Sequence, residues 1–586
     1  MAPASTSARP TSPSPSESSR AAASLSLADF DSDSGDSLQA AAGRPMVRLV
    51  AAIVLLAVFA LGAVIPARTN TPTPDEFVYV PAGLYQLRTG DLSFDPTNPP
   101  LLKMLMALPL AAMDARIDAD PRLRDNRTGW GPWIFGTSFM QLNRDRYLDL
   151  FFAARLVIVA LGVGLGVLLF ARARELVSPA AAIVALFLFA TMPPLVAHSA
   201  VATLDLGVSV LLVAALVATD RFASTREWGW AALTGALFGF AFVVKGTAVL
   251  FAPLVPLLVA LRWQRWDGPS LRWFVVGGAI MAASAWVAIL ASYGFSGFPL
   301  PAPLLEGLRF QLAASSAGEY PAFLDGRWSQ TGWWYYYLVA LALKTPIPTI
   351  ALLALGLFST AVLLRSTEKR ASALWLLLPP LLLVYFLSFH YAKDYGVRYL
   401  LPAFPFLILI AAQGADVLLG RAAGRWILAG LLAWQAVNFV VAEPDPLSWF
   451  NEFAGGPEHS RKLLLDSNLD WGQDLGRLAA WLKGRGSTSA CIGYFGHVDP
   501  KVYGIDFTLP SPAPAPGLCA ISANFLGGYP YAITYAGNGI RGVRAGAWSW
   551  YDRLEPVARI GRSIYVFDVT AEDVARLGST PAPRVP

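Results

Sequence analysis

Charge is scarce in this sequence. Only 15% of the 586 residues are Asp, Glu, Lys or Arg, and 55% are hydrophobic, whereas about a quarter of the residues of a typical soluble protein are charged. This balance predicts a protein that crosses a membrane many times. The few basic residues form no stripe interleaved with aromatic side chains, which argues against a nucleic-acid partner.

Cysteine is scarcer still. The two cysteines, Cys491 and Cys519, both lie near the end of the sequence, which excludes a metal cluster built on cysteine. Both fall in strand-like runs, ACIGYFG and LCAISANF. A disulfide and a pair of buried thiols explain this pattern about equally well.

Long apolar runs, in contrast, are abundant. The first of them, residues 45–66, is long enough to span a membrane and no cleavage site follows it, which predicts an uncleaved signal anchor. The run 99–113 is too short to span and predicts an interfacial or re-entrant helix. Eleven runs of spanning length lie near residues 47–66, 150–170, 179–197, 203–219, 229–245, 246–261, 273–293, 346–364, 372–389, 400–418 and 426–442.

Basic residues are unevenly distributed between the connections. If the N-terminus lies inside, the short inward loops hold twelve basic residues, whereas the short outward connections hold only Lys245, Lys393 and Arg398. This asymmetry follows the positive-inside rule and fixes the predicted orientation.

The sequence therefore predicts an α-helical polytopic membrane protein with about 11 transmembrane helices. Residues 1–44, rich in Ser, Ala and Pro, are expected to form a disordered cytoplasmic tail. The membrane domain is expected over residues 45–442, with long outer loops at 67–149 and 294–345. Residues 443–586 lose the spanning hydrophobicity and predict a small extracytoplasmic α/β domain.

The first outer loop carries an acidic pair and a cation. Its stretch DEFVYVPAGLYQLRTGDLSFDPTNPPLLK begins with Asp75 and Glu76 and ends with Lys103. Aromatic residues in this stretch are expected to anchor it at the level of the lipid headgroups. A carboxylate can take up a proton and an ammonium can meet a phosphate as a point charge. The pattern predicts a site for a phosphorylated lipid, and an ordinary solvated loop is the alternative.

Further ionisable residues lie near the ends of apolar runs. Asp205 and Lys245 are functional candidates because an ionisable residue is costly inside a membrane, although a side chain that reaches back to the interface explains Lys245 nearly as well. Arg155 follows the first outer loop and Lys393 lies in a short outward loop. All four are possible cavity residues.

The stretch DSNLDWGQD, residues 466–474, has acidic and amide side chains at alternate positions. It does not match a calcium-binding EF-hand loop, because Trp471 stands where that loop needs Gly and Arg477 where it needs Glu. We interpret it as a structural or acceptor-facing part of the C-terminal domain.

Several stretches occur in an order that resembles a known family. They are the acidic pair with FDPTNPPLLK, then HSAVATLDLGVSVLLVAAL, GFAFVVKGTAVLFAP, GWWYYYLVALALKTPIP, RYLLPAFPFLIL and LSWFNEFAGGPEHSRKLLLDSNLDWGQDL. Together they resemble the bacterial relatives of dolichyl- or polyprenyl-phosphate-mannose protein O-mannosyltransferases, which are family 39-like glycosyltransferases of the GT-C superfamily. The resemblance covers roughly residues 45–480.

The resemblance implies an enzyme that transfers a mannose-like monosaccharide from a polyprenyl-phosphate donor to an acceptor on the outer face of a bacterial cytoplasmic membrane. It implies that Asp75 is the catalytic base and Glu76 its partner, and that Lys103 and Arg398 face the donor phosphate. The family usually has His before the Pro pair, whereas this sequence has Asn98. Attack opposite the leaving phosphate would invert the anomeric centre.

Other functions and several details stay open at this point. A polytopic transporter or lipid flippase is the main alternative, although no internal repeat is visible and most candidate charges lie at the outer interface rather than at mid-membrane. A non-catalytic scaffold is a third. Membrane lipids are expected partners, and the acceptor can be a protein, a glycolipid or a polysaccharide. A divalent metal is possible because the acidic pair permits one, but the basic residues make it dispensable.

Overall fold

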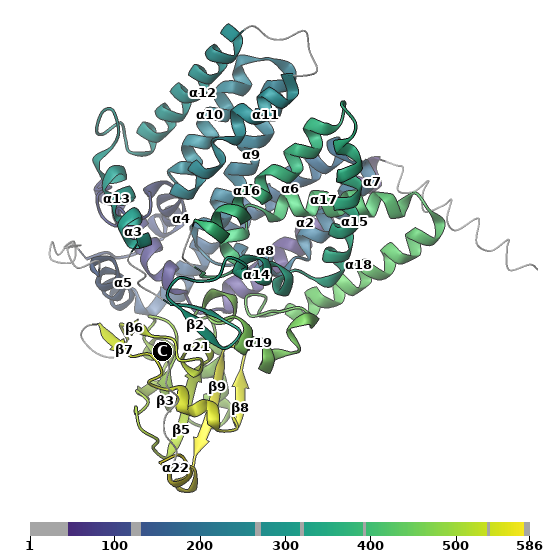
Figure 1. Ribbon diagram of the computed structural model, residues 1–586. Coiled ribbons are helices and arrows are strands. Elements are labelled where there is room, and N and C mark those ends of the chain that lie inside the picture. The colour runs from purple at the N-terminus through teal and green to yellow at the C-terminus, as the bar shows by residue number, and fades with distance from the viewer. Residues whose placement is uncertain are drawn as a thin grey trace, which may run out of the picture. The chain divides into compact units, whose positions relative to one another are not determined.

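The computed structural model describes six stretches of the chain, residues 45–118, 130–263, 271–316, 321–390, 394–535 and 540–578. Within them, residues from Ala52 onward form one compact unit. Most of this unit up to residue 442 is helical, and the residues after 442 contain a five-stranded sheet (Figure 1). The predicted tail, residues 1–44, and the candidate Lys393 lie outside the described residues.

Seven helices among the described residues are long and apolar enough to cross a membrane. Their lengths reflect continuous apolar runs of at least 18 residues, which can span most of a hydrocarbon core about 30 Å thick. They are α2 (Pro45–Thr69), η2 with α6 (Arg144–Leu176), α9 (Leu204–Thr225), α12 (Leu271–Ser292), α15 (Ile347–Leu364), α16 (Arg370–Phe389) and α18 (Ala422–Ala442).

The other predicted runs are also helical, but they are bent or short. Helices α7 (Pro179–Ala190) and α8 (Pro193–Ser199) meet at a bend of 61° and count as an eighth span if taken together. Two adjacent prolines open α8, and proline disfavours a helical residue before it, which explains the break. The shorter apolar helices are α4 (Pro100–Ala112), α10 (Trp228–Phe242), η3 (Gly246–Phe251) with α11 (Leu254–Trp263), and α17 (Phe404–Leu419).

All eleven predicted runs therefore contain a helix, whereas within the described stretches seven or eight helices have the length and composition of a full span. Apolar composition located the helices, but it did not reveal where prolines and the break after Lys245 shorten them.

Close packing between α15 and α17 fixes the helix that follows the candidate residue Arg398. A Cβ atom added at Gly356 would lie 1.8 Å from the backbone oxygen of Ile410, and one added at Gly414 would lie 2.1 Å from that of Leu352. Only glycine permits this approach of two helix backbones. The middle of α17 therefore packs directly against the backbone of α15.

The described parts of the two long segments that were predicted to lie outside the membrane, here called the outer loops, contain helices and strands of their own. The first contains α3 (Pro74–Thr89), α4 and α5 (Gly131–Leu142). The second contains α13 (Ala302–Ser316), a hairpin of β1 (Ala322–Leu324) and β2 (Arg327–Ser329), and α14 (Tyr336–Lys344).

Helix α3 begins directly at the predicted acidic pair. Pro74 occupies its first turn, where a missing backbone donor costs nothing. The Glu76 carboxylate accepts a hydrogen bond of 2.8 Å from the backbone N–H of Thr73, which ties the helix start together. The helix ends at Gly90, whose φ of 70° closes the last turn. Both acids thus lie in the first turn, where the helix dipole favours negative charge.

A five-stranded mixed sheet follows the last apolar helix, in the order β4-β3-β5-β9-β8. Strand β3 (Ser489–Gly493) runs parallel to β4 (Asp506–Thr508) and β5 (Gly517–Ser522), and β9 (Ile564–Val569) runs antiparallel to β5 and β8 (Ala558–Ile560). Strands β6 (Tyr531–Ile533) and β7 (Arg541–Val543) form a separate hairpin. The strand-like runs around the two cysteines and RSIYVFDV coincide with β3, β5 and β9, which confirms the predicted mixture of strands and helices.

Short helices connect and cover these strands. Their apolar faces complete the core of this region. They are η5 (Glu452–Ala454), α19 (Pro457–Leu463), η6 (Asp466–Asn468), α20 (Leu475–Gly484), η7 (Pro500–Tyr503), α21 (Ala523–Leu526), η8 (Ser549–Arg553) and α22 (Ala571–Gly578).

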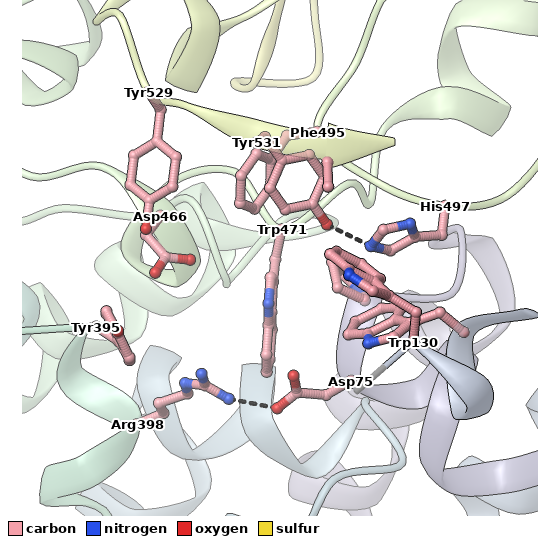
Figure 2. A pocket seen from close by; sticks show the side chains of 13 residues that line it. Asp75, Trp130, Tyr395, Arg398, Asp466, Trp471, Phe495, His497, Tyr529 and Tyr531 are labelled. Atoms are coloured by element: carbon pink, nitrogen blue, oxygen red, sulfur yellow. Dashed lines mark hydrogen bonds and ion pairs between the residues drawn. The ribbon is translucent and has the colours of Figure 1, made fainter. Parts of the chain in front are cut away.

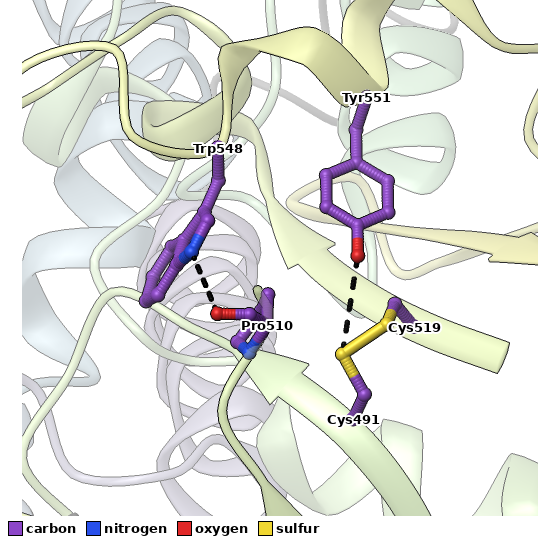
Figure 3. Close-up of a disulfide and its surroundings, with 5 residues drawn as sticks. All are labelled: Cys491, Pro510, Cys519, Trp548 and Tyr551. Carbon is purple, nitrogen blue, oxygen red and sulfur yellow. Dashed lines mark hydrogen bonds between the residues drawn. A yellow bond between two sulfur atoms is a disulfide. The ribbon is translucent and has the colours of Figure 1, made fainter. Parts of the chain in front are cut away.

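The two cysteines form a disulfide between β3 and β5. Cys491 and Cys519 are direct partners in the strand register, with Cα atoms 4.4 Å apart. The hydroxyl of Tyr551 lies 4.0 Å from the sulfur of Cys491 (Figure 3). Of the two alternatives that the sequence left open, the structure has the disulfide.

A buried lysine ties the strand-rich region to the second outer loop. Lys344, at the end of α14, donates hydrogen bonds to the backbone oxygens of Leu447, Trp449 and Asn468 at 2.8, 2.5 and 2.6 Å. Asn468 in turn accepts a hydrogen bond from the backbone of Val397, just before Arg398. Segments far apart in the sequence thus converge around the candidate site.

Candidate active site

An ion pair between Asp75 and Arg398 forms the centre of the site. Asp75 lies in the first turn of α3, and Arg398 lies in η4 (Val397–Leu400), shortly before α17. The guanidinium donates to the Asp75 carboxylate at 2.6 Å (Figure 2). The pair is partly exposed, at 23% for the Asp75 side chain and 10% for that of Arg398. The indole of Trp471 lies 4.5 Å from the guanidinium carbon and stacks against its face.

A cavity of about 470 Å³ opens on one side of this pair. We call it the charged cavity because Asp75, Asp205, Lys245 and Arg398 line it together with the polar side chain of Asn98. Its remaining walls are largely apolar and come from α9, η3, α13 and α16; they include Leu204, Val249, Leu250, Leu304, Leu308 and Phe386. The cavity thus combines a small group of charges with a surface suited to hydrocarbon.

Asp205 links the two cations of the charged cavity. Its carboxylate forms a salt bridge with Lys245 and lies 3.8 Å from the Arg398 guanidinium. The Lys245 ammonium also lies 4.4 Å from the ring centre of Tyr399. Asp205 and Lys245, predicted separately from the sequence, are therefore direct partners at the same cavity as Asp75 and Arg398.

A second, smaller pocket of about 180 Å³ also has Asp75 and Arg398 in its wall. We call it the aromatic pocket because three tryptophans and three tyrosines line it with Phe495 and His497 (Figure 2). Asp75 and Arg398 lie at its base, and Asp466 is the further carboxylate in its wall. The lining aromatic residues are Trp130, Trp133, Tyr395, Trp471, Phe495, Tyr529 and Tyr531.

Burial sets the protonation of several groups around the pair. Burial raises the pKa of the Tyr79 hydroxyl well above its usual range, so this hydroxyl stays protonated. The Tyr79 hydroxyl lies 3.5 Å from the Asp75 carboxylate. Burial lowers the pKa of His497 to about 3, which leaves its ring neutral. Burial also raises the pKa of Asp466 to about 6, although the positive charge of Arg398 opposes this rise.

Glu76, the neighbour of Asp75, points away from both cavities. Its carboxylate forms two hydrogen bonds with the Arg155 guanidinium, at 2.6 and 2.8 Å, and accepts a third from the backbone of Ala202 at 2.8 Å. Arg155 also donates to three backbone oxygens at the end of α2 and in the loop after it. Both side chains are almost completely buried, so this pair joins α3, α6 and the connection between α8 and α9.

Lys103 also has a buried partner of its own. Its ammonium donates to the carboxylate and to the backbone oxygen of Asp95 at 2.8 and 2.9 Å. Asp95 has a φ of 51°, an unusual conformation that this double contact holds. The turn that carries Asn98 to the charged cavity is fixed in this way, while Lys103 itself does not line the cavity.

The structure thus brings Asp75, Asp205, Lys245 and Arg398 together, whereas Glu76, Arg155 and Lys103 lie in the protein interior around them. Sequence reasoning missed most of the aromatic pocket. The missed residues Trp133, Phe495 and Tyr531 come from α5, from the loop after β3 and from β6. The aromatic-rich stretches GWGPW and GYPYA were the available signal.

The candidate residues supply groups for acid–base chemistry and for binding an anion. Carboxylates and cations lie within hydrogen-bond reach of one another at a site between two cavities. In the parts of the chain that the structure describes, no three His, Cys, Asp or Glu side chains are grouped as a metal site.

Comparison with known families bears on the class of this arrangement. The profile of the family described as dolichyl-phosphate-mannose-protein mannosyltransferase matches residues 135–289. This match confirms the predicted resemblance and, with it, the predicted enzyme class, a membrane glycosyltransferase. A comparison with curated proteins finds no match.

Among solved structures, the chain resembles ArnT from Cupriavidus metallidurans in the apo state, with 14% identity, a TM-score of 0.45, and coverage of 90% of this chain and 98% of that one. ArnT bound to undecaprenyl phosphate gives 14% identity, a TM-score of 0.43, and coverage of 89% and 98%. The oligosaccharyltransferase of Archaeoglobus fulgidus in the apo form gives 14% identity, a TM-score of 0.38, and coverage of 73% and 58%.

Proposed function

We propose that this glycosyltransferase moves a mannose-like monosaccharide from a polyprenyl-phosphate donor to a hydroxyl group of an acceptor, with inversion and with Asp75 as the base. The observation that carries the proposal is the position of the ion pair. Asp75 and Arg398 border both the charged cavity and the aromatic pocket, so groups bound in the two can meet at Asp75.

The donor is proposed to occupy the charged cavity. Lys245 and Arg398 provide two cations for the phosphate, and charge-assisted hydrogen bonds of this kind are the strong ones. The apolar walls suit the first units of a prenyl chain, which lose contact with water there. A single cavity can therefore recognise both parts of a lipid phosphate.

The proposed reaction needs only a base and a stabilised leaving group. The acceptor oxygen attacks C1 of the sugar while the bond from C1 to the phosphate oxygen breaks, and the proton of the hydroxyl passes to Asp75. The electron pair of the broken bond leaves with the polyprenyl phosphate, whose charge Arg398 and Lys245 stabilise. Attack opposite the phosphate inverts the anomeric centre.

The buried candidates are proposed to position these groups. Glu76, with Arg155, sets the direction of the first turn of α3 and therefore the place of Asp75. Lys103 fixes the turn before α4, through Asp95, and so acts on the donor cavity indirectly. In this account Glu76 and Lys103 support the site without touching the reacting atoms.

We propose that the protein lies in the bacterial cytoplasmic membrane with its N-terminus inside and residues 443–586 outside. The uneven distribution of basic residues supports this orientation. The disulfide between Cys491 and Cys519 supports it as well, because disulfides persist in oxidising compartments.

The variant Asp75→Asn tests the proposed function. Full-length protein in lipid nanodiscs is given polyprenyl-phosphate mannose, and transfer to envelope extracts and hydroxyl-bearing acceptors is measured. We expect a loss of about 100-fold or more, the usual contribution of a general base. Asp149→Asn, which alters an exposed ion pair with Arg68, is the matched control and is expected to keep its activity. Unchanged transfer by Asp75→Asn would reject Asp75 as the base, whereas no transfer by the wild-type protein to any acceptor would favour a transporter or flippase.

A further inference from the structure

The walls of the aromatic pocket are ordered by contacts among the rings themselves. The Trp133 and His497 rings lie 4.3 Å apart, and those of Phe495 and Tyr531 lie 4.1 Å apart. The Tyr531 hydroxyl and the His497 ring nitrogen are hydrogen-bonded at 2.7 Å (Figure 2). The surface that a ligand would meet is therefore formed in advance, which reduces the entropy cost of binding.

The size of the aromatic pocket limits what it can hold. Its volume is about 180 Å³, against about 470 Å³ for the charged cavity. A space of this size suits a group of about the size of one sugar ring, and the remainder of a larger acceptor would lie outside it.

The chemistry of the pocket distinguishes between such units. The electron-rich faces of aromatic rings attract the slightly positive C–H groups on one face of a pyranose. The hydroxyls at the edge of the pyranose need polar partners, which Asp466, Tyr531 and Asp75 supply from different walls. A purely apolar ring would bury Asp75, Arg398 and Asp466 without replacing their contacts with water, which is costly.

The position of the pocket indicates which substrate contributes the ring. In the proposed reaction the phosphate lies with Lys245 and Arg398 in the charged cavity. The attacking hydroxyl must approach from the opposite side and reach Asp75 there. The aromatic pocket shares Asp75 and Arg398 with the charged cavity but contains neither Asp205 nor Lys245, so it suits the acceptor rather than the donor lipid.

We propose that the aromatic pocket binds a pyranose ring of the acceptor, and that the protein therefore extends a carbohydrate, either free or attached to a larger molecule. The ring lies against Tyr531, Phe495 and Trp133 and presents one hydroxyl to Asp75. The C-terminal region thus supplies the acceptor site through β6 and the loop after β3. This inference rests on the proposed function.

Two soluble acceptors test this assignment in the full-length protein in nanodiscs. With polyprenyl-phosphate mannose as the donor, we expect transfer to methyl α-D-mannopyranoside or methyl α-D-glucopyranoside and little transfer to a hexapeptide containing Ser and Thr. The variants Tyr531→Leu and Trp133→Leu are expected to raise KM for the glycoside at least tenfold and to leave KM for the donor unchanged. An unchanged donor KM also shows that the variants are folded.

A tryptophan outside the site gives the matched control. Trp426→Leu removes an exposed ring from α18 and is expected to leave both KM values unchanged. Preferred transfer to the peptide, with both pocket variants at wild-type KM, would overturn the carbohydrate assignment and leave the proposed function intact.

Binding of the methyl glycosides in the absence of the donor separates carbohydrate binding from glycosyl transfer. Saturation-transfer NMR with the methyl glycosides is expected to detect binding to the wild-type protein and to lose the signal in Tyr531→Leu. Glycoside binding together with no transfer to any acceptor would overturn the proposed function. Absence of glycoside binding in a protein that glycosylates the peptide would overturn the present inference.

Discussion

Asp75 and Glu76 are neighbours in the first turn of α3, and each is paired with an arginine, but their surroundings differ sharply. The Glu76 pair with Arg155 is almost completely buried and is surrounded by backbone partners. The Asp75 pair with Arg398 is partly exposed and borders two cavities. Successive residues on a helix point about 100° apart because a turn takes 3.6 residues. One acid therefore faces the interior while the next faces the site.

This difference indicates that one acid of an adjacent pair can stabilise the fold while the other is available for chemistry. A carboxylate with four fixed hydrogen bonds that lines neither cavity is poorly placed to take a proton from a substrate. The partly exposed Asp75 carboxylate, which borders two cavities, can contact a substrate and change its hydrogen-bond partner. Substitution of Glu76 is therefore expected to lower stability, whereas substitution of Asp75 is expected to lower activity.

The largest effect on stability is expected from Glu76→Gln. This change leaves the buried Arg155 guanidinium without its counter-charge, and breaking such a pair typically costs about 3–5 kcal/mol. We expect a clear fall in the midpoint temperature of unfolding in detergent, with less folded protein recovered. Asp149→Asn should unfold near the wild-type temperature, because exposed pairs contribute little. A wild-type melting temperature for Glu76→Gln would remove the contrast between the two acids.

A smaller effect, on donor binding, is expected from Lys245→Met. The substitution keeps most of the side-chain length but removes the charge proposed to meet the phosphate, and a hydrogen bond to a charged group contributes about 1.5–3 kcal/mol. KM for the polyprenyl-phosphate donor should therefore rise about tenfold or more. Lys501→Met, at an exposed lysine in η7, serves as the control. An unchanged donor KM would show that Arg398 meets the phosphate without Lys245.

A third carboxylate, that of Asp466, lines the aromatic pocket together with Asp75, and its titration is expected to make the stability of the protein depend on pH. Burial raises the folded-state pKa of Asp466 to about 6, above the value of about 3.9 for an unfolded chain. The contribution of its neutral form to stability is therefore complete below about pH 4 and is lost as the pH rises through 6. The variant Asp466→Asn should lose less stability than the wild type between pH 4 and 7. Thermal unfolding across this range provides the measurement, and identical slopes would show that Asp466 does not titrate there.

The smallest effect is expected from Tyr79→Phe. The Tyr79 hydroxyl lies 3.5 Å from the Asp75 carboxylate, a distance at which a hydrogen bond is weak. Its removal should lower kcat only a few-fold and leave the melting temperature nearly unchanged. A loss as large as that of Asp75→Asn would instead assign the proton transfer to the tyrosine.

The helices and the polar centre of the site could be predicted from the sequence because each depends on local signals. Apolar runs located the membrane helices, and charges near the ends of such runs indicated Asp205 and Lys245. The acidic pair after the first run indicated Asp75, and the family resemblance indicated Arg398. Their membership in one cavity could not be predicted, since Asp75 and Arg398 are 323 residues apart. Tertiary contacts bring them together, among them the hydrogen bond from the backbone of Val397 to Asn468 of the strand-rich region.

Two other features were beyond sequence reasoning for physical reasons. Adjacent acids look equivalent until the start of the helix at Pro74 fixes their directions, so the inward turn of Glu76 was not predicted. The aromatic pocket combines Trp133 from α5 with Phe495 and Tyr531 from the strand-rich region. No periodicity in the sequence relates these segments, because their contact arises only in the tertiary fold.

In the proposed division of roles, Asp75 performs chemistry while Glu76 maintains structure. The most direct measurement is the rate of mannose transfer from polyprenyl-phosphate mannose per folded molecule, compared between Asp75→Asn and the wild type alongside their melting temperatures. We expect a rate lower by about 100-fold or more at a nearly unchanged melting temperature. A folded Asp75→Asn protein that transfers the sugar at close to the wild-type rate would contradict this division.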